Sequence, residues 1–346
     1  MSEAGSTYKR QPPPLLMRSI LGAGLFGIGR PMMRFWEKTG RAERAFQKGT
    51  ARRYQRLAEN NPFQGYTPSA HDVIVATYAK SGTNWMMQMA HQLLFHGGGE
   101  FEHIHCVVPW PDTADMGPLR RYAIPLEDDS VWRASPEQKR VIKTHFPWEL
   151  IPYSKDARYI MVIRDPKDVF VSSYFFFVKD GPLAGPLPTL DTWYKVFLAG
   201  NLPVAGSWVK NTAGYWAQRH LPNVLVLSFK SMKRDLRGTV DKLAAFLDVR
   251  VSGEILDRVA EKSSFDYMNR IDEKFRMWKM IPWRGENRML RKGAHGGSSE
   301  LLSLERQREM DARFMAELKR LGSDFPYGEF CEITPGAERS ESAVHA

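Results

Sequence analysis

One stretch of the chain, residues 71–85, constrains the fold more than any other. Positions 72–77 are mainly β-branched and small apolar residues, typical of a strand that a parallel sheet buries on both faces. The residues that follow and carry polar chemistry are Lys80, Ser81, Gly82 and Thr83. From Asn84 onward the apolar residues recur at helical spacing. Free N–H groups at a helix start, a glycine, two hydroxyls and an ammonium suit an anion, so the stretch predicts a phosphate-binding loop between strand and helix.

The order of residues in this loop differs from that of the nucleoside triphosphatases. Their loop reads Gly, then four residues, then Gly-Lys-Ser/Thr. Here Lys80 precedes Gly82, and Ala76 and Thr77 stand where the upstream glycine would be. Taken alone, the loop also fits an ordinary strand-to-helix turn with a solvated lysine. The choice between these interpretations depends on the other motifs.

A second predicted strand begins at Arg140 and delivers Lys143, Thr144 and His145 at its end, before Pro147 breaks it. In open α/β sheets the ligand crevice lies outside the carboxyl ends of the strands. A histidine there suits a general base, because its near-neutral pKa lets it accept a proton and carry it. The alternative is a strand-end histidine whose ring nitrogens bond to the backbone.

A third predicted strand begins at Arg158 and ends at Arg164, and a helix starts near Lys167. Ser172 lies eight residues after Arg164, on this helix. A guanidinium and a hydroxyl placed in this way can hold one phosphate, and bidentate pairing strengthens the share of the arginine. The alternative is a local ion pair between Arg164 and Asp168.

Two more segments complete the predicted core. Residues 223–229 read as a fourth buried strand, and residues 232–247 as one helix with an apolar face. The loop 101–125 is rich in proline, so we place part of an acceptor pocket there, and we expect the Gly/Pro-rich segment 180–188 to gate it.

These motifs, in this order, resemble the cytosolic sulfotransferase family, whose members use 3′-phosphoadenosine 5′-phosphosulfate (PAPS) as donor. The matching patterns are Lys-Ser-Gly-Thr-x-Trp at 80–85, Lys-Thr-His-x-Pro at 143–147, Arg-x-Pro-x-Asp-x-x-x-Ser at 164–172 and Arg-Lys-Gly at 291–293. The resemblance implies an α/β fold of P-loop-like type: one domain with a mainly parallel central sheet flanked by helices. It also implies PAPS as co-substrate and no metal.

The resemblance assigns roles to individual residues. It implies that His145 is the catalytic base, that Lys80 neutralises charge on the leaving phosphate, and that Lys143 stabilises the transferring oxygens. The residues that it implies for nucleotide binding are Lys80, Ser81, Gly82, Thr83, Asn84, Trp85, Arg164, Ser172, Phe229, Ser263, Arg291, Lys292 and Gly293.

The sequence also departs from the family pattern. Phe229 stands where the family has an adenine-contacting tyrosine, so stacking is kept and a hydroxyl contact is lost. Asp165 replaces a commoner asparagine. Ser263 replaces a threonine, and an ordinary helix cap is the alternative for it. After Gly293 the family's usual continuation is absent, which leaves the oligomeric state open.

Composition narrows the partners and the compartment. The net charge of +10 predicts an anionic partner, whether nucleotide, acidic membrane surface or nucleic acid, and does not choose among them. Cys106 and Cys331 are the only cysteines, so we expect no disulfide framework and a cytoplasmic location. His103, His105 and Cys106 raise the alternative of a metal site, but the fourth-ligand spacing is missing, and we expect hydrogen-bonded or solvated histidines.

The N-terminal part of the chain is a basic arm. We expect residues 1–60 to form this arm, disordered over about 1–14, followed by a catalytic domain over 61–334 and a disordered tail over 335–346. The apolar stretch from Leu15 to Trp36 is interrupted by arginines, and Pro31 is predicted to break it, so we expect no transmembrane helix. Two interpretations stay open: the arm packs on its own domain, or it makes peripheral contact with a membrane or a partner.

We therefore expect a sulfotransferase that acts on a hydroxyl or amine of an apolar small molecule, by in-line attack with His145 as base, and has no nucleic-acid partner. Two other classes stay open. A kinase or triphosphatase would need a magnesium-binding hydroxyl, for which Ser81 could serve, and an acidic strand-end partner, which is not obvious. A non-catalytic protein that binds nucleic acid, membrane or another anion would also explain the charge.

Overall fold

The computed structural model describes residues 8–10, 12–115, 122–179, 188–278, 282, 288–290 and 297–337. The predicted Arg-Lys-Gly motif at 291–293, most of the predicted gating segment 180–188 and residues 338–346 of the predicted disordered tail lie outside these residues.

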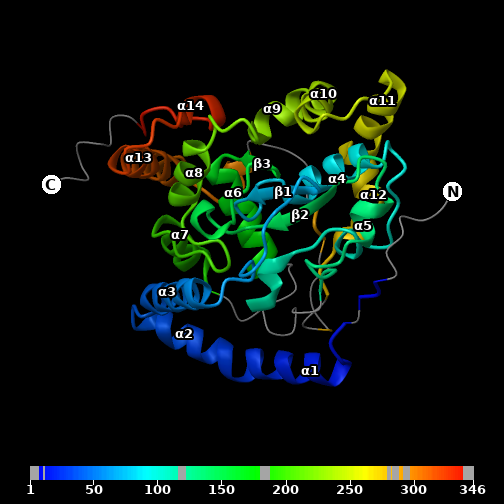
Figure 1. Cartoon of the computed structure of the whole chain (residues 1–346). Helices are drawn as coiled ribbons and strands as arrows, with labels where there is room; N and C mark the ends of the chain where they lie inside the picture. The colour runs from blue at the N-terminus through cyan, green and yellow to red at the C-terminus, as the bar shows by residue number, and fades with distance from the viewer. Residues whose placement is uncertain are drawn as a thin grey trace.

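A four-stranded parallel sheet forms the centre of the molecule (Figure 1). Its strands are β1 (Asp72–Thr77), β2 (Arg140–Thr144), β3 (Arg158–Ile163) and β4 (Val224–Ser228). The strand order is β2-β1-β3-β4, so β1 lies between β2 and β3, and every pairing is parallel. The predicted α/β fold with a parallel sheet is confirmed.

Alternate residues of each strand bury opposite faces of the sheet. On one face, Val73, Val75 and Ile160 belong to a core shared with helices α4 (Thr83–Leu94) and α10 (Leu236–Leu247). On the other face, Ile74 and Met161 belong to a second core, which Leu57 and Tyr215 complete from helices α3 (Ala42–Glu59) and α8 (Trp208–Ala217). Burial on both faces explains why the strands read as continuous apolar runs.

The remaining helices surround the sheet (Figure 1). A third core joins α6 (Pro166–Ser173), α7 (Leu190–Leu198), α8, α13 (Leu304–Arg320) and α14 (Tyr327–Phe330). Shorter or peripheral elements are α5 (Ser130–Ala134), α9 (Phe229–Arg234), α11 (Gly253–Lys262), α12 (Phe265–Arg270) and the π-helical turn η6 (Tyr174–Lys179).

The helix predicted over 232–247 is in fact two helices, α9 and α10. Asp235 lies between them, and its carboxylate accepts a hydrogen bond from the N–H of Gly238 at 2.8 Å. An aspartate in this position caps a new helix start, and this local bond overrides the continuous apolar spacing.

The basic arm is helical along most of its length. It consists of α1 (Leu15–Gly24), the π-helical turn η1 (Leu25–Gly29), α2 (Arg30–Lys38) and α3. The prediction that Pro31 breaks this segment is wrong, because the backbone stays helical from α1 through η1 into α2. A widened π turn directly before a proline accommodates its ring and its missing N–H. Within the described part of the chain, no helix combines the length and apolar character needed to cross a membrane.

The arm packs on the body at several points. On α3, the hydroxyl of Thr50 donates to the carbonyl of Asn201 at 3.2 Å, and the guanidinium of Arg53 donates to the carbonyl of Val204 at 2.7 Å. Ahead of α1, Arg10 donates to the carbonyl of Tyr122 at 3.0 Å and lies over its ring at 4.1 Å. Arg10 is therefore an anchored residue, although the sequence predicts disorder there. Residues 1–7 and 11 lie outside the described residues.

Candidate active site

The carboxyl ends of the four strands meet at one edge of the sheet. In the register of the sheet, Ala76 pairs with Thr144, Thr77 with Val162, and Ile163 with Ser228. The residues directly after these strands therefore converge, as ligand-binding residues do in parallel α/β sheets. They are the loop from Tyr78 to Gly82, His145, Arg164 and Phe229.

The loop after β1 has the shape of an anion-binding turn. Lys80 adopts a left-handed backbone conformation with φ of 70°, which a non-glycine residue takes only where the surroundings fix it. Gly82 has φ of 99°, and a Cβ there would lie 2.7 Å from the ring of Phe229. The helix α4 begins at Thr83, whose hydroxyl is 2.5 Å from that of Thr77. The Oγ of Ser81 is buried and has no hydrogen-bond partner among the described residues.

Lys80 is the cation of this loop. Its Nζ lies over the ring of Phe176, 3.9 Å from the centroid, and Phe176 comes from η6. Burial, and then the nearby charge of Arg164, lower the pKa of Lys80 to about 7. An ammonium held in this way is poorly compensated, and a bound anion would restore its charge.

His145 is held in one tautomer by the strand beside it. Its Nδ1 is 2.9 Å from the carbonyl oxygen of Thr77, which can only accept, so Nδ1 carries the proton and Nε2 has the lone pair. Its backbone N–H donates to Asp112 at 2.7 Å, and Asp112 also accepts from the hydroxyl of Thr144 at 2.8 Å. Burial, and then the charge of Lys143, lower the pKa of His145 well below its usual value.

Lys143 precedes this histidine and lies beside an aromatic ring. Its Nζ is 3.3 Å from the ring centroid of Trp110, and the side chain is almost completely buried. Burial lowers the pKa of Lys143 to about 7; the charge of Lys80 lowers it too, while Asp112 acts in the opposite direction. Trp110 also packs edge-on against His145, with ring centroids 5.7 Å apart.

Arg164 marks the other end of the site. It donates to the carbonyl of Lys80 at 3.2 Å, and its guanidinium lies over the ring of Phe229 at 4.4 Å. It also approaches Asp168 at 3.5 Å, so the local ion pair considered from the sequence is present alongside these contacts. Ser172 lies near the end of α6, half-buried, and in the described part of the chain it has no hydrogen bond to Arg164.

An aromatic pair, Trp85 and Phe229, connects Arg164 to Ser263. Trp85 packs edge-on against Phe229 with centroids 5.4 Å apart, and its indole N–H donates to the carbonyl of Ser263 at 2.7 Å. The Oγ of Ser263 is buried without a hydrogen-bond partner among the described residues. A helix cap is the alternative role that the sequence offers for Ser263. The cap is made instead by the neighbouring Ser264, whose hydroxyl accepts from the N–H of Tyr267. Asn84 is half-buried in the first turn of α4.

These residues fit a nucleotide that carries two phosphates. The buried hydroxyls of Ser81 and Ser263 have no hydrogen-bond partner among the described residues, so they are available to a ligand. Lys80 and Arg164 supply positive charge, and Trp85 and Phe229 supply aromatic surface. Arg164 and Phe229 line a cavity of about 180 Å³, together with Ser298 and Gln307. Arg291, Lys292 and Gly293, assigned by resemblance to the same ligand, lie outside the described residues.

Three residues of this site are absent from the sequence-based assignment: Asp112, Trp110 and Phe176. Asp112 and Trp110 come from the proline-rich loop in which the sequence places part of an acceptor pocket, so that signal finds the segment but not the side chains. Phe176 belongs to the aromatic run 174–177, to which the sequence analysis assigns no role. No local pattern shows that these side chains contact His145, Lys143 or Lys80.

The histidines considered as metal ligands use their ring nitrogens within the protein. His103 bonds to the carbonyl of Arg276 at 3.0 Å and accepts from the N–H of His105 at 3.1 Å. His105 bonds to the carbonyl of Val108 at 3.0 Å. Across the described ranges, no group of three or more His, Cys, Asp or Glu side chains is placed to hold a metal ion.

A parallel sheet whose strand ends carry an anion-binding turn, a half-buried lysine, a buried lysine and a buried histidine is typical of a nucleotide-dependent group transferase. A family model described as "Sulfotransferase domain" matches residues 70–322, which is most of the chain. The chain therefore belongs to the sulfotransferase family, and it is an enzyme that uses PAPS as co-substrate.

Individual relatives agree with this assignment. The chain is 31% identical to sulfotransferase 2A1 of Macaca fascicularis over 267 residues, covering 74% of this chain and 87% of that protein. It is 30% identical to an amine sulfotransferase of Oryctolagus cuniculus over 279 residues, covering 79% and 87% of the two chains. Among solved structures, retinol dehydratase in complex with androsterone and the inactive cofactor PAP has the same fold, with a TM-score of 0.64 at 23% identity over 80% of this chain and 88% of that one.

Proposed function

We propose that this enzyme transfers a sulfuryl group from PAPS to a hydroxyl or amine of an apolar small molecule, with His145 as base. The observation that carries this proposal is the fixed tautomer of His145, whose Nδ1 bonds to the last residue of β1, directly before the loop that holds Lys80. The free Nε2 is the atom that would take the proton of the acceptor.

The surroundings of His145 suit a base. Its lowered pKa keeps the imidazole neutral at physiological pH, so it does not need to lose a proton before it can accept one. Asp112 holds the backbone N–H of His145 and the hydroxyl of Thr144, which fixes the turn that carries the ring.

The two lysines provide positive charge on the same edge of the sheet. When bound, PAPS supplies the sulfuryl group and a phosphate leaving group. We propose that Lys80 neutralises charge on the leaving phosphate oxygen and that Lys143 stabilises the transferring oxygens. Fixed cations in a buried site are effective because little reorganisation accompanies the reaction. Ser81, Thr83 and the loop amides would hold the 5′-phosphate, and Arg164 would hold the 3′-phosphate.

The acceptor side of the site is aromatic. Trp110 contacts His145 and Lys143, and Tyr122 packs edge-on against Trp110 with centroids 5.9 Å apart. Such surfaces favour an apolar alcohol, phenol or amine. Among the relatives are a hydroxysteroid sulfotransferase of Cavia porcellus and an amine sulfotransferase, and the solved retinol dehydratase structures contain androsterone or retinol. We extend this acceptor class to the present chain as part of the proposal.

The experiment that tests the reaction incubates the full chain with labelled PAPS and a panel of sterols, phenols, amines and glycans. Labelled apolar alcohol or amine would support the proposal, and labelling of glycans alone would contradict the acceptor class. A parallel assay with ATP and magnesium addresses the kinase or triphosphatase alternative, which magnesium-dependent turnover would favour.

We also propose that residues 61–334 form the catalytic domain and that the enzyme acts in the cytoplasm. The arrangement of the sheet and its helices supports the first proposal, and the buried free thiols of Cys106 and Cys331 support the second. Peripheral membrane contact by the N-terminal arm does not depend on the reaction and rests on different residues.

A further inference from the structure

The outer side of the N-terminal arm exposes a row of large apolar side chains. Leu16, Ile20, Ile28 and Phe35 have 72%, 63%, 70% and 54% of their surface exposed, although side chains of this kind are normally buried. Met32, also exposed, follows Ile28 by four residues. We call these five residues the apolar stripe. Leu16 and Ile20 are four residues apart on α1, and Ile28, Met32 and Phe35 are four and three residues apart from η1 into α2, so each set shares one side of its helix. The π turn η1, between the two sets, determines their relative rotation.

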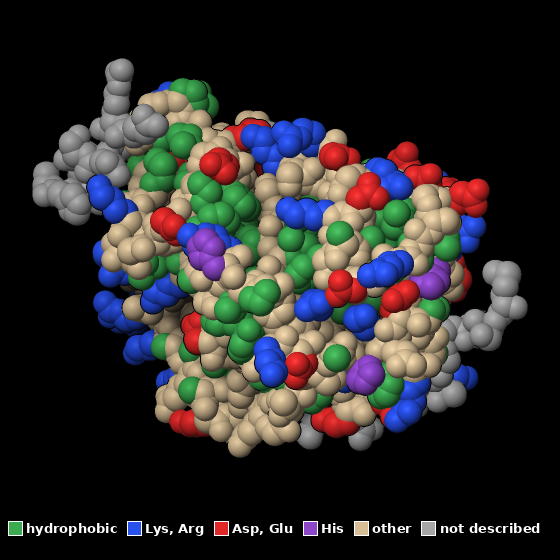
Figure 2. Space-filling view, turned by 45° about the horizontal axis from the view of Figure 1, so that its top comes forward, with side chains coloured by type: hydrophobic (Ala, Val, Ile, Leu, Met, Phe, Trp, Pro, Cys, Tyr) green, Lys and Arg blue, Asp and Glu red, His purple; other side chains and the backbone are tan. Residues whose placement is uncertain are grey.

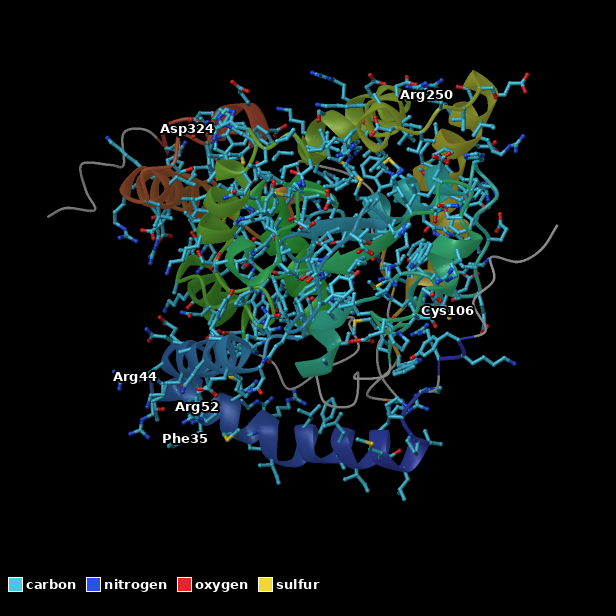
Figure 3. The ribbon with its side chains drawn as sticks, viewed as in Figure 1. Phe35, Arg44, Arg52, Cys106, Arg250 and Asp324 are labelled. Carbon is cyan, nitrogen blue, oxygen red and sulfur yellow. The ribbon has the colours of Figure 1, made fainter. Side chains whose placement is uncertain are left out.

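Basic residues accompany the apolar stripe. Residues 15–59 contain ten Lys or Arg and three Asp or Glu, a net charge of +7. On α3, four basic residues recur at every fourth position on the exposed side: Arg44, Lys48, Arg52 and Arg56. Figure 3 shows Phe35, Arg44 and Arg52 at the same corner of the molecule, where α2 turns into α3.

Two of the three acidic residues of the arm turn toward the body. Glu37 accepts hydrogen bonds from the N–H and the hydroxyl of Thr189 at 2.7 and 2.9 Å. Glu43 pairs with Lys195 at 3.8 Å, on α7. The surface that faces away from the body is consequently apolar and basic. By contrast, the face that comes forward in Figure 2 mixes acidic and basic side chains.

We propose that the arm is a membrane-docking surface, which lies in the plane of a bilayer containing anionic phospholipids, with the apolar stripe among the lipid chains and the α3 basic residues at the headgroups. An in-plane helix with an apolar face and nearby Lys and Arg has the chemistry for this. A second copy of the chain is a poorer occupant, because pairing two such faces would bring together two surfaces of net charge +7.

The position of the arm relates this surface to the proposed acceptor site. Arg10, ahead of α1, lies over the rings of Tyr122 and Trp278, and Tyr122 packs against Trp110 beside His145. The arm therefore begins beside the aromatic side of the site and runs along the lower edge of the molecule in Figure 1. Docking would place that side near the bilayer, where apolar alcohols dissolve. This last step rests on the proposed function; docking itself does not.

The test is flotation of the full chain with vesicles of phosphatidylcholine, with or without phosphatidylglycerol. We expect binding to the anionic vesicles, weakened by salt, and little binding to the neutral ones. The triple variant Ile20→Ser, Ile28→Ser, Phe35→Ser should lose binding by about tenfold or more. Leu304→Ser is the matched control, because Leu304 is 61% exposed on α13, and it should bind like the parent chain.

Two triple variants with reversed charge, one on the arm and one as a control, test the basic residues. Arg44→Glu, Lys48→Glu, Arg52→Glu should reduce binding to anionic vesicles by about tenfold or more. The control triple, Lys233→Glu, Arg234→Glu, Arg250→Glu, makes the same charge change on exposed residues and should bind like the parent; Figure 3 shows Arg250 at the end of the molecule far from the arm.

Three results would overturn docking. The first is equal flotation with neutral and anionic vesicles, or no flotation with either. The second is a loss of vesicle binding in the control variants equal to that in the arm variants. The third is a dimer, detected by light scattering, that the stripe variant converts to a monomer. Transfer to a water-soluble phenol should be unchanged in the arm variants. Loss of flotation with intact transfer separates this inference from the proposed function, and so does intact flotation with no transfer.

Discussion

The proton on Nδ1 of His145 has one partner, the carbonyl of Thr77, and this bond determines what the other nitrogen can do. Since Thr77 ends β1, the position of the histidine depends on the pairing of β1 with β2 and not on a flexible side-chain contact. Removal of the imidazole should therefore affect proton transfer and leave the nucleotide-binding residues in place.

We expect His145→Ala to abolish sulfuryl transfer while the affinity for 3′-phosphoadenosine 5′-phosphate changes by less than about 1 kcal/mol. Activity assays and calorimetry on the same preparation measure both quantities. His220→Ala, at an exposed position, is the control and should behave like the parent. Substantial transfer by the His145 variant would show that another group is the base.

Lys143 illustrates the cost of a buried cation. Its pKa is about 7 in the folded chain and near 10.5 in the unfolded chain, so between these values the unfolded chain binds more protons. Stability should therefore rise as pH increases from about 7 to 10, and below about 7 the folded chain carries the full cost of the buried charge.

We expect Lys143→Met to increase the free energy of unfolding by about 1–3 kcal/mol near pH 6 and to reduce transfer strongly. The gain should shrink as pH rises from about 7 toward 10.5, because the folded chain then holds the lysine neutral while the unfolded chain still protonates it. Urea unfolding over a pH series measures this. A constant difference at every pH would contradict the assigned cause.

The loop between β1 and α4 is the element on which the nucleotide site depends. Gly82 combines a positive φ with close approach to Phe229, and Phe229 in turn touches Trp85 and Arg164. A side chain at position 82 would therefore displace the aromatic surface as well as strain the turn.

We expect Gly82→Ala to destabilise the chain by about 1–3 kcal/mol and to weaken nucleotide binding. Thermal unfolding and calorimetric titration measure the two effects. Gly253→Ala is the matched control, because a Cβ at position 253 meets nothing within 4 Å. Equal effects of the two substitutions would argue against a special role for the loop.

The elements that the sequence predicts well are those determined by local pattern. The strand β1 has the predicted bounds, because a buried strand needs only a short apolar run. The contact of Asp112 with His145 joins residues 33 positions apart, and no periodicity encodes it. Pro31 misleads for a different reason: its usual effect on a helix is cancelled by the π turn ahead of it.

A buried hydrogen-bond network joins the C-terminal segment to α6 and α13. Nζ of Lys167 on α6 bonds to Asp311 of α13 at 2.5 Å and to the carbonyl of Glu332 at 2.6 Å. Asp311 also accepts from Tyr327 and from the N–H of Thr334, at 2.7 and 2.8 Å. This buried network joins residues far apart in sequence to the helix that follows Arg164.

We expect Asp311→Ala to destabilise the chain by about 1–3 kcal/mol, because it removes the nearer carboxylate of Lys167 and leaves the ammonium with Asp165 alone, at 3.4 Å. The double variant Lys167→Met, Asp311→Leu should recover part of this loss, since it removes both members of the closest ion pair. Chemical denaturation of the three chains measures the difference. A double variant no more stable than the single one would contradict a cost due to the loss of this ion pair.

The π turn at Leu25–Gly29 also sets the phase between the two halves of the arm. A π turn holds about one residue more than an α turn, so it acts as a rotational offset between α1 and α2. Shortening it by one residue would rotate Leu16 and Ile20 by roughly 100° relative to Met32 and Phe35. The two halves would then point in different directions while the composition of the arm hardly changed, so the geometry of this single turn makes one surface out of two helices.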